Sequence, residues 1–170
     1  MLDRSQGDTA LVQLSERLTN SAAFGTLFRE GMDLVEETAA YLDGIGRVEA
    51  KALDRSVSLS YATESMRLTT RLMQLASWLL LHRAVKEGEM TLSQANREKT
   101  KVKLSAADPS SDAMIEKLPQ QLQDLIARSM TLQVKVRRLD STIHAPVSER
   151  AAIGNPLVPQ LNRLKAAFER

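Results

Sequence analysis

Residues 61–90 read YATESMRLTTRLMQLASWLLLHRAVKEGEM, and this stretch has the pattern of one long α-helix. Leucine, methionine and alanine recur in it at spacings of three and four residues, which is the repeat of a helical face. All prolines of the chain lie after residue 108, and Gly88 ends the pattern. We therefore expect a single helix from Val48 to Glu87. At 1.5 Å per residue it spans about 60 Å, so it projects beyond its neighbours or pairs with a second chain.

This long helix carries two rows of side chains, which the sequence assigns to opposite faces. The first row is expected to face the other helices and consists of Leu59, Ala62, Met66, Thr69, Leu72, Met73, Ala76, Leu79 and Leu80. The second row begins polar and reaches the only tryptophan and a histidine: Ser60, Glu64, Arg67, Arg71, Gln74, Trp78 and His82. Because Trp and Arg are favoured interface anchors, this outer face predicts a protein-contact surface made of Arg67, Arg71, Trp78 and His82.

The residues around Trp78 leave two alternatives for what covers its side chain. It lies beside Leu79, Leu80 and Leu81, so the helix is apolar almost all round at this level. Such a helix needs cover on every side. The cover is either the chain's own N-terminal, C-terminal or 91–104 segment, or another molecule.

A second helix is expected before the long one. Asn20 or Ser21 can cap its start, and Gly44-Ile45-Gly46 ends it. Gly31 falls on its apolar stripe, where a missing side chain favours close approach of a neighbouring helix.

Two further helices are expected after the long one. Thr91 and Gln94 have the spacing of a capping box, which predicts a short helix through about Thr100. Apolar residues then recur at helical spacing from Ile115 to Ile143. Pro119 either kinks this helix or marks where it restarts.

These elements predict an all-α fold: a three-helix bundle with a long central helix, a short helix after it and flexible termini. Residues 1–20 are expected to be a mobile N-terminal segment and residues 21–144 the bundle domain. Residues 145–170 are expected to be a flexible C-terminal tail. A short amphipathic stripe in that tail predicts a docking segment formed by Leu157, Leu161, Leu164 and Phe168.

Composition excludes several classes of protein. The chain has 170 residues and no cysteine, so disulfides and thiolate metal sites are ruled out. The longest uncharged stretch of the central segment, Leu72 to His82, has 11 residues, whereas a membrane span needs about 20. The first residues lack the apolar core of a signal peptide. We therefore expect no membrane association.

The residues that chemistry requires are not arranged as known sites arrange them. The sequence has no glycine-rich phosphate loop and no Gly-x-Ser-x-Gly motif. Di-iron bundles use Glu-x-x-His, but Leu79 and Ser141 lie three residues before His82 and His144. We expect His82 to be partly buried with one hydrogen bond, and His144 to be exposed. The sequence therefore predicts a protein that is not an enzyme, with no catalytic residue, metal or cofactor.

The alternative function is a DNA-associated helical regulator that uses the basic C-terminal half. The small net charge of +2 arises there, from Lys101, Lys103, Lys135, Arg137 and Arg138. Duplex binding usually needs a concentrated basic surface, and acidic residues dilute this one. Nucleic acid is therefore the less favoured partner.

Three stretches of the chain resemble one known family. They are LFREGMDLVEETAAYLDG at residues 27–44, YATESMRLTTRLMQLASWLLLHRAVKEGEM at 61–90, and SQANREKTKVKL shortly after it. Together they resemble the regulator of CtrA degradation family of alphaproteobacteria. The similarity extends over roughly residues 20–143.

The resemblance implies a fold and a function. It implies a homodimer of three-helix bundles that acts as a non-enzymatic adaptor in the cytoplasm and at the cell pole. Such an adaptor tethers cell-cycle regulators to the ClpXP protease for regulated proteolysis. Its implied partners are ClpXP, a single-domain response regulator that primes the protease, a cyclic-di-GMP-binding adaptor and the substrate proteins.

Overall fold

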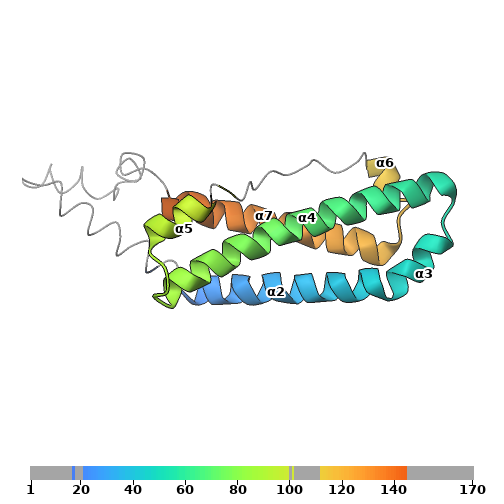
Figure 1. The fold of residues 1–170 in the computed structure, drawn as a ribbon. Coiled ribbons are helices and arrows are strands. Elements are labelled where there is room, and N and C mark those ends of the chain that lie inside the picture. The colour runs from blue at the N-terminus through green and yellow to red at the C-terminus, as the bar shows by residue number, and fades with distance from the viewer. Residues whose placement is uncertain (1–16, 18–20, 100, 102–111, 145–170) are drawn as a thin grey trace, which may run out of the picture.

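Three long helices form the body of the protein. The structure is a computed structural model, and it describes residues 17, 21–99, 101 and 112–144. Helices α2 (Ala22–Asp43), α4 (Arg55–Lys86) and α7 (Gln120–His144) pack against one another (Figure 1). The part of the chain that the structure describes contains no strand. The predicted all-α fold with three long helices and a short helix after the central one is therefore confirmed.

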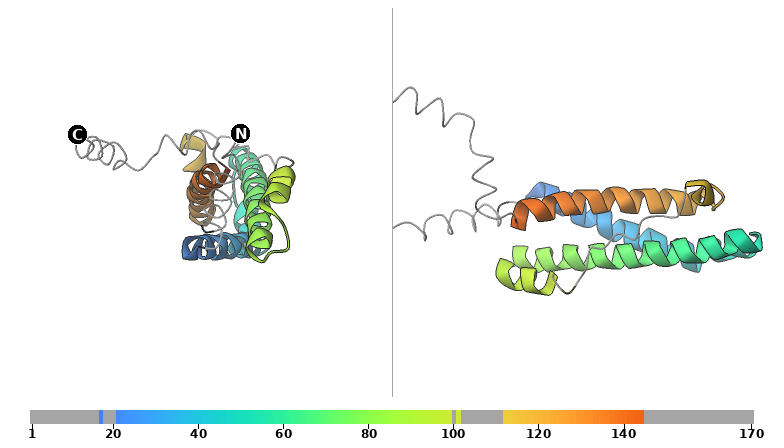
Figure 2. Two further views of the ribbon diagram at one scale, coloured as in Figure 1. Left: turned by 90° about the vertical axis from the view of Figure 1, so that its left-hand side faces the viewer. Right: turned by 90° about the horizontal axis from the view of Figure 1, so that it is seen from above.

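The three long helices do not simply alternate in direction. Phe24 near the start of α2 packs against Trp78 near the end of α4, with ring centroids 6.3 Å apart, so these helices are antiparallel. Trp78 in turn contacts Asp140 near the end of α7, so α4 and α7 run parallel (Figure 2). Helix α5 (Leu92–Lys99) lies beside the end of α4, and α6 (Asp112–Ile115) lies beside its beginning. The chain therefore returns to the far end of the bundle before α7 starts.

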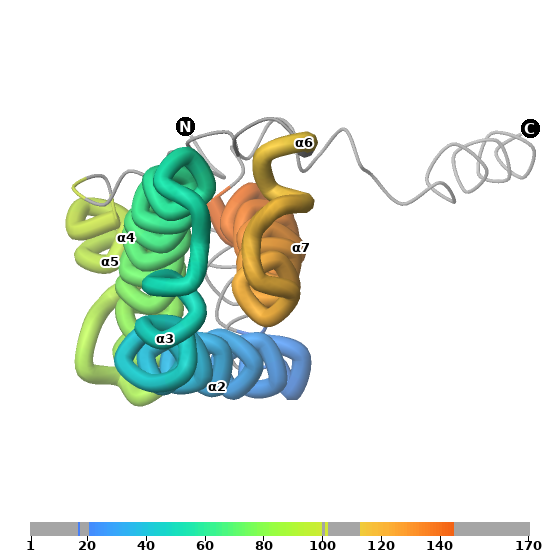
Figure 3. The backbone as a smooth tube through the Cα atoms, turned by 90° about the vertical axis from the view of Figure 1, so that its right-hand side faces the viewer, coloured from blue at the N-terminus to red at the C-terminus, as the bar shows by residue number. Residues whose placement is uncertain are grey.

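The predicted single helix from Val48 to Glu87 is wrong, because a separate helix, α3 (Ile45–Lys51), precedes α4. Helix α3 joins α2 to α4 across one end of the bundle (Figure 3). Gly46 sits directly against Tyr41 and Tyr61, where a Cβ would clash with both. Tyr41 Oη also donates a hydrogen bond of 2.6 Å to Glu49. These contacts hold α3 across the bundle end, so the chain bends at residues 52–54 before α4 begins.

The ends of the other helices follow the local signals in the sequence. Ser21 Oγ accepts the N–H of Phe24 at 3.2 Å and caps α2, which ends at Asp43 as expected. Thr91 and Gln94 bond to each other's backbone N–H groups, which confirms the capping box of α5. Pro119 marks a restart, since α7 begins directly after it.

The buried face of α4 is rotated relative to the one expected. Its buried residues include Glu64, Arg71, Trp78 and His82 from the predicted outer row. From the predicted inner row, Leu72 and Leu79 are buried, but others are mostly exposed: Leu59, Met66, Met73 and Leu80. The buried face also carries Tyr61, Leu68 and Leu75, so it buries the largest apolar side chains of the helix. The prediction was wrong because it assigned the row with charged side chains to the exposed face.

The buried charges on α4 are tolerated because they have partners. Glu64 accepts a hydrogen bond of 2.7 Å from Arg67. Arg71 donates one of 2.9 Å to Ser129 Oγ on α7, and Ser129 donates to the backbone carbonyl of Ile126. A buried charge with hydrogen-bond partners avoids most of the penalty of desolvation.

Gly31 provides a test of the α2–α4 contact, because an added Cβ would collide with the buried side chain of Leu79. We expect Gly31→Ala to lower the free energy of unfolding by about 1–2 kcal/mol, since Leu79 has to move. Gly25 lies on the same helix with no atom within 4 Å of its would-be Cβ. Gly25→Ala should instead raise it by about 0.5–1 kcal/mol. Urea denaturation measures both, and equal stabilisation by the two changes would contradict the contact.

Candidate protein-binding surface

One face of α4 is apolar and uncovered among the described residues. Leu59, Met66, Met73 and Leu80 form what we call the heptad row, since they lie seven residues apart. Seven residues make almost two helical turns, so all four lie along one side of α4. Their exposed fractions range from 52% to 72%. None of the described helices is both long and apolar enough to cross a membrane. Exposed apolar side chains gathered along one face are typical of an interaction site.

Shallow hollows flank the heptad row. A groove of about 320 Å³ lies between α2 and α4 and is lined mainly by apolar and small side chains, including Val35, Leu42, Leu72, Met73 and Ala76. A second hollow next to Leu80 is bounded by Glu98 and Lys101 at the end of α5. Exposed ridges beside apolar hollows can accept the side chains of a packed helix.

The predicted contact residues do not form an exposed patch. Arg71, Trp78 and His82 are each less than 5% exposed, and only Arg67 keeps about a third of its side chain exposed. Burial lowers the pKa of the Arg71 guanidinium. The expected outward orientation of Trp78 is therefore wrong. Its cover is the chain itself, through Phe24 of α2 and Asp140 of α7.

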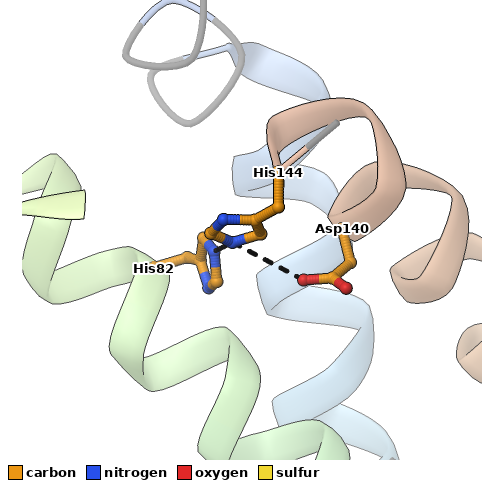
Figure 4. Close-up of side chains that lie close together, drawn as sticks. All are labelled: His82, Asp140 and His144. Carbon is orange, nitrogen blue, oxygen red and sulfur yellow. Dashed lines mark hydrogen bonds and ion pairs between the residues drawn. The ribbon is translucent and has the colours of Figure 1, made fainter. Parts of the chain in front are cut away.

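A group of polar side chains, the polar cluster, closes one end of the bundle. It consists of Trp78 and His82 on α4, Lys99 on α5, and Asp140 and His144 on α7. Asp140 is its centre: it accepts a hydrogen bond of 2.8 Å from Trp78 Nε1 and lies 2.7 Å from Lys99 Nζ. His144 Nε2 lies 3.6 Å from the same carboxylate, one helical turn away (Figure 4). One carboxylate thus connects three helices.

The tautomer of His82 follows from its neighbours. Its Nδ1 lies 2.9 Å from the backbone carbonyl of Trp78, which can only accept, so Nδ1 carries the hydrogen. Burial, the largest effect, lowers the pKa of His82 and keeps the ring neutral. Its Nε2 therefore carries the lone pair, which accepts a hydrogen bond of 3.2 Å from His144 Nε2. The ring also stacks on Trp78 with centroids 3.9 Å apart.

Both histidine predictions need correction. His82 is fully buried and makes two side-chain hydrogen bonds, not one. His144 is not in an exposed linker: it is the last residue of α7, and its side chain is 13% exposed. The sequence could not show that these residues meet, because the parallel packing of α4 and α7 joins positions 62 residues apart. The i,i+4 spacing of Asp140 and His144 was the available signal, and it was missed.

Several basic residues of the C-terminal half pair with acidic side chains in the described part of the chain. Lys135 pairs with Glu30 at 2.8 Å, and Arg128 pairs with Glu37 at 2.7 Å. Lys101 pairs with Glu98 at 2.8 Å. Lys103 lies outside the described residues. Two of these pairs join α7 to α2, and all three reduce the positive charge that a contact with duplex DNA would use.

The predicted tail contacts stay predictions. Residues 145–170, with Leu157, Leu161, Leu164 and Phe168, lie outside the described part of the chain, as do residues 1–16 and 18–20. The predicted domain boundaries stay predictions as well. In the described residues, Ser21 caps α2 and His144 is the last residue of α7.

Comparison with known proteins places this bundle in one group. A family model described as "Protein of unknown function (DUF1465)" matches residues 15–168. The crystal structure of RcdA from Caulobacter crescentus CB15 is similar, with a TM-score of 0.64 and 48% sequence identity. The match covers 77% of this chain and 98% of that chain. No curated protein sequence matches the chain.

The two faces of α4 can be separated by truncating one residue on each. Trp78→Ala should lower the free energy of unfolding by about 3–5 kcal/mol, because it opens a cavity in the core. Met73→Ala, on the heptad row, should change it by no more than about 0.5 kcal/mol at protein concentrations where the chain is monomeric. Denaturant titration monitored by circular dichroism compares them. Similar losses for both variants would mean that α4 is oriented differently.

Proposed function

Since the chain belongs to the RcdA family, we propose that it is a non-enzymatic adaptor for regulated proteolysis. It tethers cell-cycle regulators to the ClpXP protease together with a priming single-domain response regulator. A cyclic-di-GMP-binding adaptor belongs to the same assembly. The site of action is the cytoplasm, including the cell pole.

Tethering explains why such a protein needs surfaces and no reactive site. An adaptor that holds a substrate beside a protease raises its effective concentration, so modest affinities for each partner suffice. The heptad row is the observation that carries this proposal. Four large apolar side chains stay exposed on a helix that buries charges on its other face. Exposing these apolar side chains to water costs free energy, and such surfaces mark sites of interaction with a partner.

A second copy of this chain is the occupant that we assign to the heptad row. The row repeats every seven residues, which is the spacing along which two helices pack in a coiled coil. A two-fold axis brings the same row of two identical chains together. Two α4 helices packed along it bury the methionines and fill the groove between α2 and α4. Methionine suits such a contact because its flexible side chain adapts to the facing surface. The resulting homodimer presents two copies of every other surface.

The tail supplies the second contact of the adaptor. Its amphipathic stripe, Leu157, Leu161, Leu164 and Phe168, has the spacing of a helix that lays one apolar face into a groove on a partner. In this arrangement the bundle dimerises through α4, and the tail docks on the protease or on a substrate.

A reconstituted degradation assay tests the function. Purified ClpXP, the priming response regulator, the cyclic-di-GMP-binding adaptor and a candidate substrate are incubated with and without this protein. The proposal predicts a shorter substrate half-life with the protein present, and a loss of that effect when residues 145–170 are removed. An unchanged half-life for every cell-cycle substrate tested would refute the adaptor role.

The heptad row is tested with Met66→Lys combined with Met73→Lys. Two buried charges should weaken self-association by at least about tenfold, equivalent to about 1.4 kcal/mol, while the thermal melt of the monomer stays unchanged. Val134→Lys, at an isolated exposed apolar residue of α7, is the matched control and should leave the dimer intact. Analytical ultracentrifugation measures both.

Two outcomes of that experiment would contradict the assignment. A double variant that dimerises as the parent does would show that the row is not the dimer contact. A variant that is dimeric but no longer shortens the substrate half-life would instead assign the row to the substrate.

A further inference from the structure

We propose that the polar cluster binds one transition-metal ion of the zinc type, through His82 Nε2, His144 Nε2 and the Asp140 carboxylate. The ion links the last turn of α7 to α4. This inference goes beyond the adaptor role and does not depend on it.

The distances between the ligand atoms suit such an ion. Nitrogen ligands of tetrahedral zinc lie 2.0–2.1 Å from the metal, which places two of them about 3.3 Å apart. The two Nε2 atoms here are 3.2 Å apart, and His144 Nε2 is 3.6 Å from Asp140 Oδ1. All three ligand atoms lie within 4.8 Å of one another. The two imidazoles therefore stand at ligand spacing. His144 binds the ion in the tautomer that carries its hydrogen on Nδ1, and turning the Asp140 carboxylate completes the set.

Neighbouring groups orient the ligands before any ion binds. The Trp78 carbonyl accepts a hydrogen bond from His82 Nδ1–H, which leaves Nε2 as the coordinating atom. The indole of the same tryptophan donates to Asp140 and holds its carboxylate toward the cluster. His144 follows Asp140 by four residues, so both side chains project from one face of α7 (Figure 4). Backbone and side chain of Trp78 thus serve one ligand each.

The donor set also indicates which metal fits. Two imidazoles and one carboxylate favour zinc, cobalt or nickel over magnesium and calcium, which prefer oxygen ligands only. Three protein ligands leave a fourth position of a tetrahedral ion for water or for a group from a partner. The link fastens His144, the last residue of α7, to α4.

Lys99 is the competitor of the ion. Its ammonium lies 2.7 Å from the carboxylate and neutralises the charge that a metal needs. Binding therefore requires Asp140 to turn one oxygen away from Lys99 or to share its two oxygens between the cations. Replacing Lys99 with a neutral residue should therefore strengthen metal binding. If the Lys99–Asp140 pair served only to hold the helices together, its loss would loosen the site and weaken metal binding.

The test uses the full chain without an affinity tag, titrated with zinc chloride in a calorimeter and with cobalt chloride in an absorption spectrometer. We expect one ion per chain and the visible bands of tetrahedral cobalt. His144→Gln, at the end of α7, should weaken zinc binding by at least about tenfold. Lys99→Met should strengthen it several-fold. Asp124→Asn, at an exposed carboxylate of α7 outside the polar cluster, is the control and should change nothing.

Folding effects are separated from ligand loss by a second measurement. Zinc should raise the melting temperature of the parent and of Asp124→Asn, and should not raise that of His144→Gln. Absence of zinc binding in the parent, or equal binding by the parent and His144→Gln, would overturn the proposal. Weaker binding by Lys99→Met would also contradict the assigned role of Asp140.

Discussion

The orientation of α4 is the constraint on which the rest of the structure depends. This helix is apolar on more than one side, and α2 and α7 can cover only one of them. The covered side carries Glu64, Arg71, Trp78 and His82, whose polar atoms need defined partners. On α7 these partners are Ser129, Asp140 and His144, offset from α4 by 58 or 62 residues. Buried polar pairs fix the register of packed helices, so they hold α4 and α7 parallel in one alignment.

Two consequences follow from that alignment. It turns Leu59, Met66, Met73 and Leu80 outward, where they form an exposed apolar row. It also brings the ends of α4 and α7 together, so that both histidines of the chain meet at one carboxylate. The exposed heptad row and the polar cluster therefore both result from the orientation of α4. Burial of Trp78 and of the leucines on the inner side provides the free energy that favours this orientation. It outweighs the cost of exposing the flexible methionines.

Helix type and local ends could be predicted from the sequence, because they depend on neighbouring residues. The capping box at Thr91, the close approach at Gly31 and the restart at Pro119 all follow from local chemistry. The bend before α4 could not, since it depends on Tyr41 and Tyr61 holding α3 across the bundle end. The inward face of α4 was misassigned because Arg71 was taken as solvated, whereas it is buried and donates a hydrogen bond to Ser129 on a distant helix. The meeting of His82 with His144 depends on the parallel order of α4 and α7, which no periodicity encodes.

The orientation of α4 can be measured directly because the chain has no cysteine. Single cysteines placed at Met73 and at Leu75 lie two residues apart on the same helix, one exposed and one buried. Under native conditions, a maleimide reagent should modify the cysteine at position 73 rapidly and the one at position 75 only after unfolding. Raising the protein concentration should then slow modification at position 73, as the heptad row is covered by a second chain. Rapid labelling at position 75 with protection at position 73 in the monomer would contradict the account.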